Sequence, residues 1–292
     1  MLTKLVLVLG IIYIIVLLGC EKEEIVVDEE NPQIVANKEI ENTVIDEGSK
    51  PLIAVSTTDT LQILVREDGA PGMYLGEDGQ VHGFYVDLEK MIMKEMGQSY
   101  NFVPFNDVGP AAHGLKSGTY HNALAVPDVP DYRAFLNLSI PYEVLHYVIF
   151  IQNDRIDISG SSKKELFQSL HGKKVGVQSQ GHVYQILREI KEIELVEYPT
   201  TTKALEDLAK GLLDAVPDVK RIGIYYNAKN NWKIMPVGVP IMSQKVTTAI
   251  SPAFETSLVD RYNKALKTLL SDGRFDVLYE SYFGSMAEED RP

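Results

Sequence analysis

Two Pro-Asp pairs are the residues of this sequence whose type and spacing first suggest a chemistry. Asp128 and Asp218 each lie in the pentapeptide AVPDV, at 125–129 and 215–219. Two carboxylates held near each other would bind a cationic group, and they form the one acid–base pair that could serve catalysis. The alternative is that both aspartates are turn residues whose carboxylates cap local N–H groups.

Other catalytic arrangements are missing from the sequence. It has no Ser-His-Asp order with a nucleophile elbow, no phosphate-binding glycine loop and no HExxH metal spacing. The six histidines are scattered along the chain. The sequence therefore favours binding over catalysis, and we expect neither a cofactor nor a metal.

Cys20 is the only cysteine among 292 residues, and it closely follows the apolar run Leu5–Leu18. That run has the length of a signal-peptide core and falls short of the roughly 20 residues that span a bilayer. Its end, Leu-Leu-Gly-Cys, resembles a bacterial lipobox, in which the thiol is acylated and the leader is removed. We therefore expect residues 1–20 to be a lipoprotein signal peptide, with an uncleaved N-terminal anchor as the alternative.

Residues 21–50 differ in composition from the rest of the chain. They hold ten acidic residues and three lysines, which gives −7 of the chain's net charge of −13, and no aromatic residue. Such a segment cannot bury enough apolar surface to offset its ordering entropy, so we expect a flexible tether. The net negative charge does not favour binding to nucleic acid or to anionic lipid.

From Pro51 onward, short apolar runs alternate with amphipathic ones. We expect strands near 52–56, 100–105, 146–152, 173–177, 194–198, 214–216 and 246–251. We expect helices near 87–97 (N-cap Asp87, stop at Gly97), 181–191, 201–210 and 255–270. This alternation predicts an α/β fold with largely parallel sheets, in a segment long enough for two lobes.

Six motifs, in order, are similar to bacterial solute-binding protein family 3, the polar-amino-acid binders of ABC transporters. They are GEDGQVHGFYVDLEKMIMKEMG (76–97), LKSGTY (115–120), LNLSIPYE (136–143), LHGKKVGVQ (170–178), ALEDLAKGLLDAV (204–216) and YNKALKTLLSDGRFDVLYESYFG (262–284). The resemblance implies a two-lobed periplasmic-binding-protein type II fold, with a ligand cleft between lobes joined by two hinge strands. It places lobe 1 at 51–141 plus 246–288 and lobe 2 at 142–245.

The resemblance also implies a carboxylate-binding Thr-x-x-Arg pair, but the matching stretch, 125–139, is one residue short. If the gap precedes the arginine position, Val129 and Tyr132 replace the pair. If it follows, Pro130 replaces the threonine and Arg133 fills the arginine position. Arginine suits the task because its fork bonds both carboxylate oxygens. An exposed helix residue is the alternative role for Arg133.

In lobe 2 the family places Gly-Thr at a helix start, where free N–H groups hold the carboxylate. This chain has Gly181-His182 there, and Gln178, Gln180 and His182 are candidate side-chain contacts. The family's ammonium-binding Asp falls on Val219, next to Asp218.

The family's first loop carries an aromatic ring that packs on the ligand. Here that position is Gly72, so Met73 or Tyr74 is expected to supply the apolar contact. A core position is an equal alternative for Tyr74.

Together these features predict an extracytoplasmic lipoprotein, anchored to the cell membrane by lipid on Cys20. It would deliver a small polar ligand, an amino acid or related amine, to an ABC transporter permease, and we expect a monomer. One alternative is a sensor or scaffold lipoprotein whose cleft no longer serves transport. The other is a cleft enzyme of the dehydratase type, as in a few relatives of the family.

Overall fold

The computed structural model describes residues 51–179 and 182–292. The expected leader 1–20, the lipidation of Cys20, the tether 21–50 and the Gln180 contact lie outside these residues. Among the helices that the structure does describe, each is too short or too polar to cross a membrane.

The strands and helices alternate along much of the chain. The strands are β1 (Thr60–Arg66), β2 (Asp68–Gly69), β3 (Met73–Leu75), β4 (Val81–His82), β5 (Ser99–Phe105), β6 (Asn122–Pro127), β7 (Asn137–Leu138), β8 (Glu143–Gln152), β9 (Lys174–Gln178), β10 (Glu194–Tyr198), β11 (Val216–Val219) and β12 (Ile234–Ile250). The helices are α1 (Phe84–Met96), α2 (Val108–Ser117), α3 (Pro130–Arg133), α4 (Lys163–Ser169), α5 (His182–Leu187), α6 (Thr201–Ala209), α7 (Lys220–Asn230), α8 (Thr256–Ser271) and α9 (Arg274–Phe283), with a 3₁₀ turn at Glu288–Asp290.

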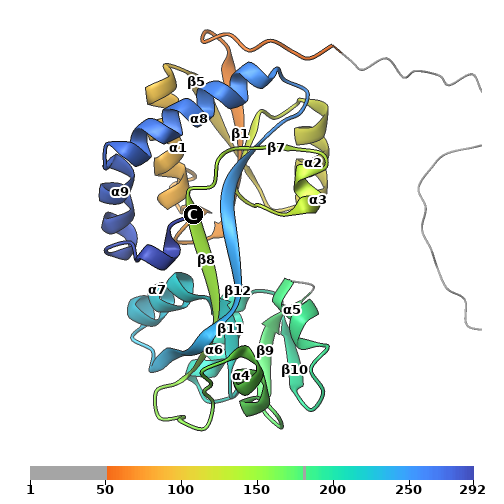
Figure 1. Ribbon diagram of the computed structural model, residues 1–292, viewed down its shortest axis with the longest axis vertical. Helices are drawn as coiled ribbons and strands as arrows, with labels where there is room; N and C mark the ends of the chain where they lie inside the picture. The colour runs from red at the N-terminus through yellow and green to blue at the C-terminus, as the bar shows by residue number, and fades with distance from the viewer. Residues whose placement is uncertain (1–50, 180–181) are drawn as a thin grey trace, which may run out of the picture. The chain divides into compact units, whose positions relative to one another are not determined.

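Two long antiparallel strands, β8 and β12, run side by side from one lobe to the other (Figure 1). They lie in the middle of a continuous sheet with the order β11-β8-β12-β6-β1-β5. β6 joins β12 on the lobe 1 side, whereas β11 joins β8 on the lobe 2 side. The two crossing strands therefore connect two separate sets of packed layers.

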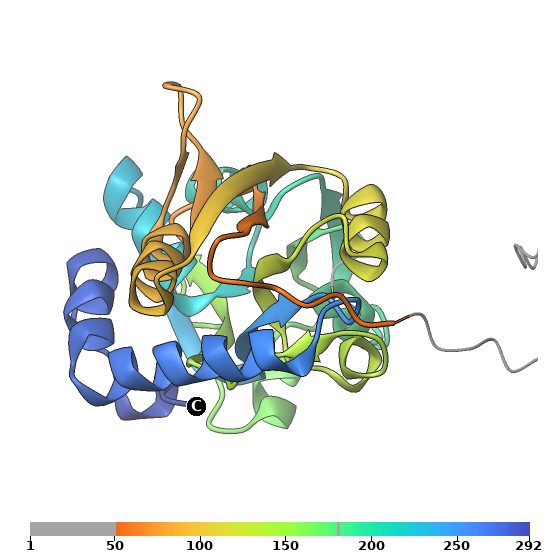
Figure 2. The same ribbon diagram turned by 90° about the horizontal axis from the view of Figure 1, so that it is seen from above.

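Lobe 1 packs helices on both faces of the β5-β1-β6 sheet. Alternate residues of β1 point to opposite faces, so Leu61 and Ile63 enter the larger core while Leu64 enters a smaller one. Residues of α1, α8 and α9 fill the larger core, and residues of α2 fill the smaller one. Figure 2 shows α8 running across this lobe.

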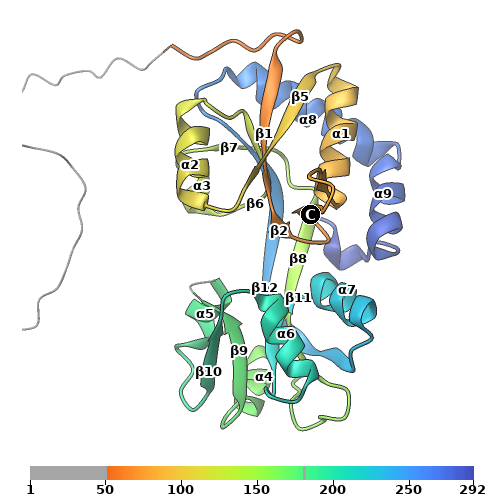
Figure 3. The same cartoon turned by 180° about the vertical axis from the view of Figure 1, so that it is seen from behind.

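Lobe 2 repeats the arrangement around β8, β9 and β11. Ile149 and Ile151 of β8 pack with residues of α4 and α5, whereas Val148 and Phe150 pack with residues of α6. In Figures 1 and 3, α4 and α5 lie on one side of these strands and α6 and α7 on the other. The expected two-lobed α/β fold is confirmed.

Three local expectations were wrong. Residues 52–56 form no strand beyond a single bridge between Ile53 and Phe254, and the first strand begins at Thr60. Asp87 lies in the first turn of α1, which starts after Gly83, although Gly97 does end the helix in a left-handed conformation with φ 63°. The sheets are mixed, because the pairs of β12 with β6 and β8 and of β11 with β8 are antiparallel.

Candidate ligand-binding site

The carboxyl ends of β6 and β11 approach the same stretch of the crossing strands from opposite lobes. Pro127 of β6 pairs with Val246, which faces Glu143, and Val219 of β11 pairs with Tyr147. At about 3.3 Å per residue, the two strand ends lie roughly 13 Å apart along β8. The edge beyond the carboxyl ends of parallel strands is where open α/β sheets bind ligands. We therefore place the candidate site at these ends.

Asp218, at the end of β11, is a buried carboxylate that is only half satisfied. Its residue is 6% exposed, and its Oδ1 accepts a hydrogen bond of 2.7 Å from the Val219 N–H. Its Oδ2 is buried and has no hydrogen-bond partner among the described residues. Burial raises the pKa of Asp218 to about 7, because a buried carboxylate loses hydration that one N–H bond does not replace. The capping role considered for Asp218 is thus present, but it uses only one of the two oxygens.

Gln178 ends the neighbouring strand of lobe 2 at the same level. A parallel bridge between Val175 and Ala215 sets the register, and continuing it by three residues brings Gln178 opposite Asp218. The Gln178 side chain is exposed, with a donor bond of 3.4 Å to the Pro199 carbonyl. Its polar atoms can therefore turn toward a bound molecule at little cost.

The helix after β9 is α5, which begins at His182. Gln180, Gly181 and the side chain of His182 lie outside the described residues, so their expected contacts stay predictions.

Asp128 and Arg133 lie together in lobe 1, just beyond β6. Arg133 donates from Nε and Nη2 to the two oxygens of Asp128, at 2.5 and 2.7 Å. Arg133 is 57% exposed and Asp128 only 12% exposed in their side chains. The hydrogen bonds that Arg133 donates to Asp128 raise the pKa of Arg133, so the guanidinium stays charged. The fork is therefore oriented by a carboxylate, and its outer edge faces solvent.

Met73 and Tyr74 lie in β3, which forms a small sheet with β2 and β4. Met73 is 6% exposed and belongs to the larger core of lobe 1. Tyr74 is half-buried, and its ring centre lies 5.7 Å from that of His82. Met73 thus packs in the core, and Tyr74 is the more accessible of the two candidates.

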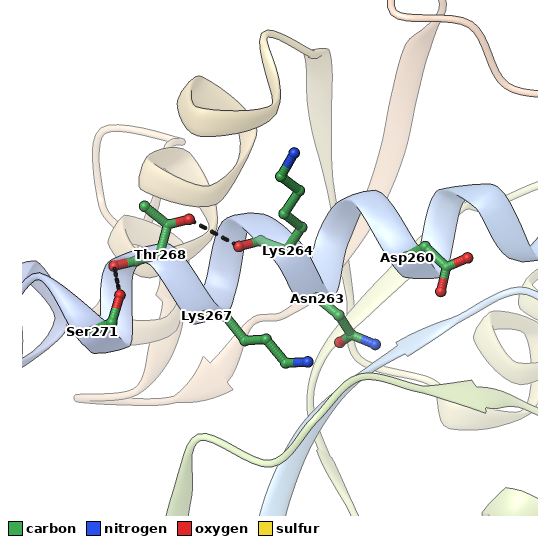
Figure 4. Close-up of a pocket in the computed structure, with 6 residues that line it drawn as sticks. All are labelled: Asp260, Asn263, Lys264, Lys267, Thr268 and Ser271. Atoms are coloured by element: carbon green, nitrogen blue, oxygen red, sulfur yellow. Dashed lines mark hydrogen bonds between the residues drawn. The ribbon is translucent and has the colours of Figure 1, made fainter.

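Two surface hollows differ in position: the first lies away from these strand ends, and the second is lined in part by Val219, at the end of β11. A shallow hollow of about 470 Å³ follows one face of α8 (Figure 4). It is lined by Asp260, Asn263, Lys264, Lys267, Thr268 and Ser271. The Thr268 and Ser271 hydroxyls bond backbone carbonyls of the same helix, and Asn263 accepts a bond from the Ile140 N–H. This hollow contains none of the predicted ligand contacts.

The second hollow, of about 220 Å³, lies where β8, α7, α9 and the C-terminal segment meet. It borders a buried cluster that the sequence did not indicate. Arg221 of α7 donates from Nη2 to the Tyr85 hydroxyl at 2.5 Å and to Glu143 Oε1 at 3.1 Å, and Tyr85 also donates to Glu143. The one available signal was an acidic residue at the start of the apolar run EVLHYVIFIQ. No three His, Cys, Asp or Glu side chains gather as metal ligands in the described part of the chain.

Residues 61–285 match the family described as bacterial extracellular solute-binding proteins, family 3. The chain belongs to this family. It is 25% identical, over 239 residues, to the putative ABC transporter arginine-binding protein 2 of Escherichia coli K12, covering 79% of this chain and 93% of that protein. It is 26% identical over 213 residues to the probable amino-acid-binding protein YxeM of Bacillus subtilis, covering 71% and 78%.

Solved structures support the same fold for this family 3 protein. An ancestral arginine-binding protein bound to glutamine is 25% identical and covers 77% of this chain and 98% of its own, with a TM-score of 0.63. A histidine kinase sensor domain with similarity to periplasmic binding proteins is 22% identical, with coverage of 81% and 99% and a TM-score of 0.67. The family and the fold expected from the six motifs are confirmed.

Proposed function

We propose that this family 3 protein is an extracytoplasmic lipoprotein that binds a small amino acid, or a related amine, between its lobes. It presents that ligand to the permease of an ABC transporter. The observation that carries the proposal is the buried Asp218 Oδ2, which has no partner in the described structure and lies at the carboxyl end of β11. An ammonium group would supply the missing hydrogen bonds and a compensating charge.

The opposite end of an amino acid needs donors, and lobe 1 offers a suitable one. Arg133, held by Asp128, presents the free edge of a planar fork that fits a carboxylate. Gln178 adds an adaptable amide beside Asp218. An ammonium on one lobe and a carboxylate on the other would join the two lobes through the ligand. Relatives named for arginine and cystine make these amino acids the first to test.

The test is thermal unfolding of residues 51–292, whose four cores are formed wholly within that range. L-arginine, L-lysine, L-histidine, L-glutamine, L-cystine, putrescine and succinate are each added. A ligand at 100 times its Kd adds about 2.7 kcal/mol to the free energy of unfolding, which is a clear rise in Tm. We expect a rise with at least one amino acid and none with succinate. No response to any amine would contradict the proposal and favour the sensor or scaffold alternative.

Membrane attachment rests on the position of Cys20 and has its own test. Acylation of this thiol would give durable anchoring if two or more chains are attached, since a single chain binds only marginally. Radiolabelled palmitate fed to cells should label the chain, and Cys20→Ala should abolish the label and release the protein. Equal labelling of both forms would contradict the anchor.

A further inference from the structure

A buried arginine of lobe 2 lies in a socket formed by lobe 1 and the start of β8. Arg221, in the first turn of α7, is 12% exposed in its side chain, and its partner Glu143 is 1% exposed. Its guanidinium carbon lies 4.4 Å from the ring centre of Phe283 and 5.3 Å from that of Tyr85. The charge is therefore held by the carboxylate of Glu143, at the start of hinge strand β8, and by a phenol and aromatic faces from lobe 1.

The C-terminal segment adds a second link on the same side. Lys220 Nζ lies 3.1 Å from Glu289 Oε1, beyond the end of α9. The Glu289 carbonyl oxygen is also 2.8 Å from Nε2 of His146 in hinge strand β8. Nδ1 of the same histidine is 2.8 Å from Oγ of Ser243 in hinge strand β12. After α9, the C-terminal segment thus contacts hinge strand β8 at His146 and lobe 2 at Lys220.

These links all lie on one side of the pivot. In the described structure, each side-chain hydrogen bond that joins residues 147–241, the part of lobe 2 beyond the middle of the hinge strands, to the rest of the protein comes from Lys220 or Arg221. Figures 1 and 3 show α7 and α9 on one side of β8 and β12, and α3 and α5 on the other. On the side that carries Arg133, the link comes from a hinge strand itself: Gln244 of β12 donates from Nε2 to the Asp128 carbonyl at 3.4 Å. In the part of the chain that the structure describes, residues 147–241 add no side-chain hydrogen bond to lobe 1 on that side.

The socket satisfies Arg221 only in part. Its Nε and Nη1 atoms are buried without a partner in the described structure, and so is Glu143 Oε2. A buried ion pair with unpartnered atoms contributes little net stability, because the desolvation cost nearly cancels the attraction. Such a contact fixes an orientation while remaining weak enough for another contact to displace it.

We propose that Arg221 and Lys220 form a brace that holds the lobes apart at the ligand-binding edge, and that closure on a ligand must break it. When two lobes turn about a pair of strands, closing one side opens the other. Part of the free energy of ligand binding is then used to break the brace. The larger the population of the braced state, the lower the apparent affinity for the ligand. This inference rests on the proposed function for its role, but the brace itself can be measured without ligand.

The direct measurement is the distance between spin labels on the ligand side of the two lobes. Residues 51–292 contain no cysteine, so Ala134→Cys on lobe 1 and Glu197→Cys on lobe 2 give one defined pair. Both positions are exposed, and neither side chain makes a hydrogen bond or ion pair in the described structure. The brace is removed in two ways. Arg221→Met with Glu143→Gln replaces the buried pair, and Lys220→Ala with deletion of 287–292 removes the outer link and leaves the core intact.

Arg274→Ala is the matched control, because it breaks an ion pair of 2.9 Å to Glu95 that lies wholly within lobe 1. Without ligand, we expect both brace variants to shift the distances toward shorter values, and the control to match the parent protein. We also expect Kd for L-arginine to fall about tenfold in the brace variants. Unchanged or longer distances in both folded brace variants would overturn the inference. Shorter distances with no binding of any amino acid would instead leave the brace standing and refute the proposed function.

Discussion

Arg133 and Asp128 form a two-pronged ion pair, with Nε and Nη2 of the guanidinium at 2.5 and 2.7 Å from the two carboxylate oxygens. Both residues follow β6, and the short helix α3 returns the arginine to the strand end. The pair fixes the plane of an otherwise exposed fork, which lowers the entropy cost of binding a ligand carboxylate. It also neutralises Asp128, so lobe 1 offers the ligand a donor, and Asp218 in lobe 2 offers the acceptor.

Arg133→Ala should therefore weaken amino-acid binding without affecting the fold. A charged hydrogen bond contributes about 1.5–3 kcal/mol, so Kd should rise by roughly 10- to 100-fold. Calorimetric titration with the amino acid found by thermal shift measures this change. Arg188→Ala, which removes an exposed arginine whose ion pair in the described structure is with Glu189, is the control and should bind like the parent protein. Equal affinity in both variants would rule Arg133 out of the site.

Asp218 should make ligand binding depend on pH near neutrality. Burial raises its pKa to about 7, and an ammonium group binds only the ionised carboxylate. Affinity should therefore fall about tenfold per pH unit below 7, so that Kd at pH 5 is about 100 times that at pH 8. Titrations across this range test the slope, and Asp218→Asn should bind weakly at every pH. A profile that is flat in the parent protein would contradict this assignment.

Glu89 should make the free energy of unfolding fall as the pH rises. It is buried in lobe 1, accepts hydrogen bonds from Tyr262 at 2.6 Å and Asn122 at 3.1 Å, and burial raises its pKa to about 7. Between pH 4.5 and 7 the folded state then holds a proton that the unfolded state has lost. The stability contributed by this proton is complete below pH 4.5 and is lost by pH 7, a change of about 3 kcal/mol.

Glu89→Gln mimics the protonated acid and is the matched variant. Urea unfolding at pH 5 and pH 8 should show the larger loss in the parent protein. The variant should be the more stable of the two at pH 8. If the parent protein instead lost no more than the variant between these pH values, Glu89 would be ionised in the fold.

The sequence predicted the helices and strands in which the pattern of apolar residues matches the face that packs in the core. The apolar run at 194–198 is β10, and the pattern at 255–270 is α8 displaced by one residue. The run at 52–56 has the same apolar character, but it finds only one bridging neighbour and stays irregular. Helix α7 has no apolar periodicity in the sequence, because the buried residue on its packed face is Gly223.

The site was predictable only where a residue's role depends on its own neighbourhood. Asp128 and Arg133 are five residues apart, and their pairing is local. The contact of Arg221 with Glu143 joins residues that are 78 apart in the sequence. The aromatic neighbours of Arg221 come from α1 and α9, which are far apart in the sequence. Such a contact follows from the docking of two lobes about β8, which periodicity and spacing do not encode.

Gly223 should be a position where a single added methyl group disturbs the packing of lobe 2. A Cβ built there would lie 2.2 Å from the ring of Phe150, which is fully buried between α6, α7 and the sheet. Alanine favours a helix over glycine by up to about 1 kcal/mol, but overpacking a buried ring costs about 1–3 kcal/mol. We expect the clash to win in Gly223→Ala, with a net loss near 1–2 kcal/mol and a Tm lower by about 2–8 °C. Gly109→Ala in α2 is the control, since the heavy atom nearest to its new Cβ would be Asp107 Oδ1 at 3.4 Å, and it should not lower the free energy of unfolding.

Phe150→Leu should lower the free energy of unfolding less in the Gly223→Ala background than alone, because it vacates the space that the new methyl group needs. Additive effects of the two substitutions would show that α7 simply moves away, and that the packing of this helix on β8 is looser than the contact implies.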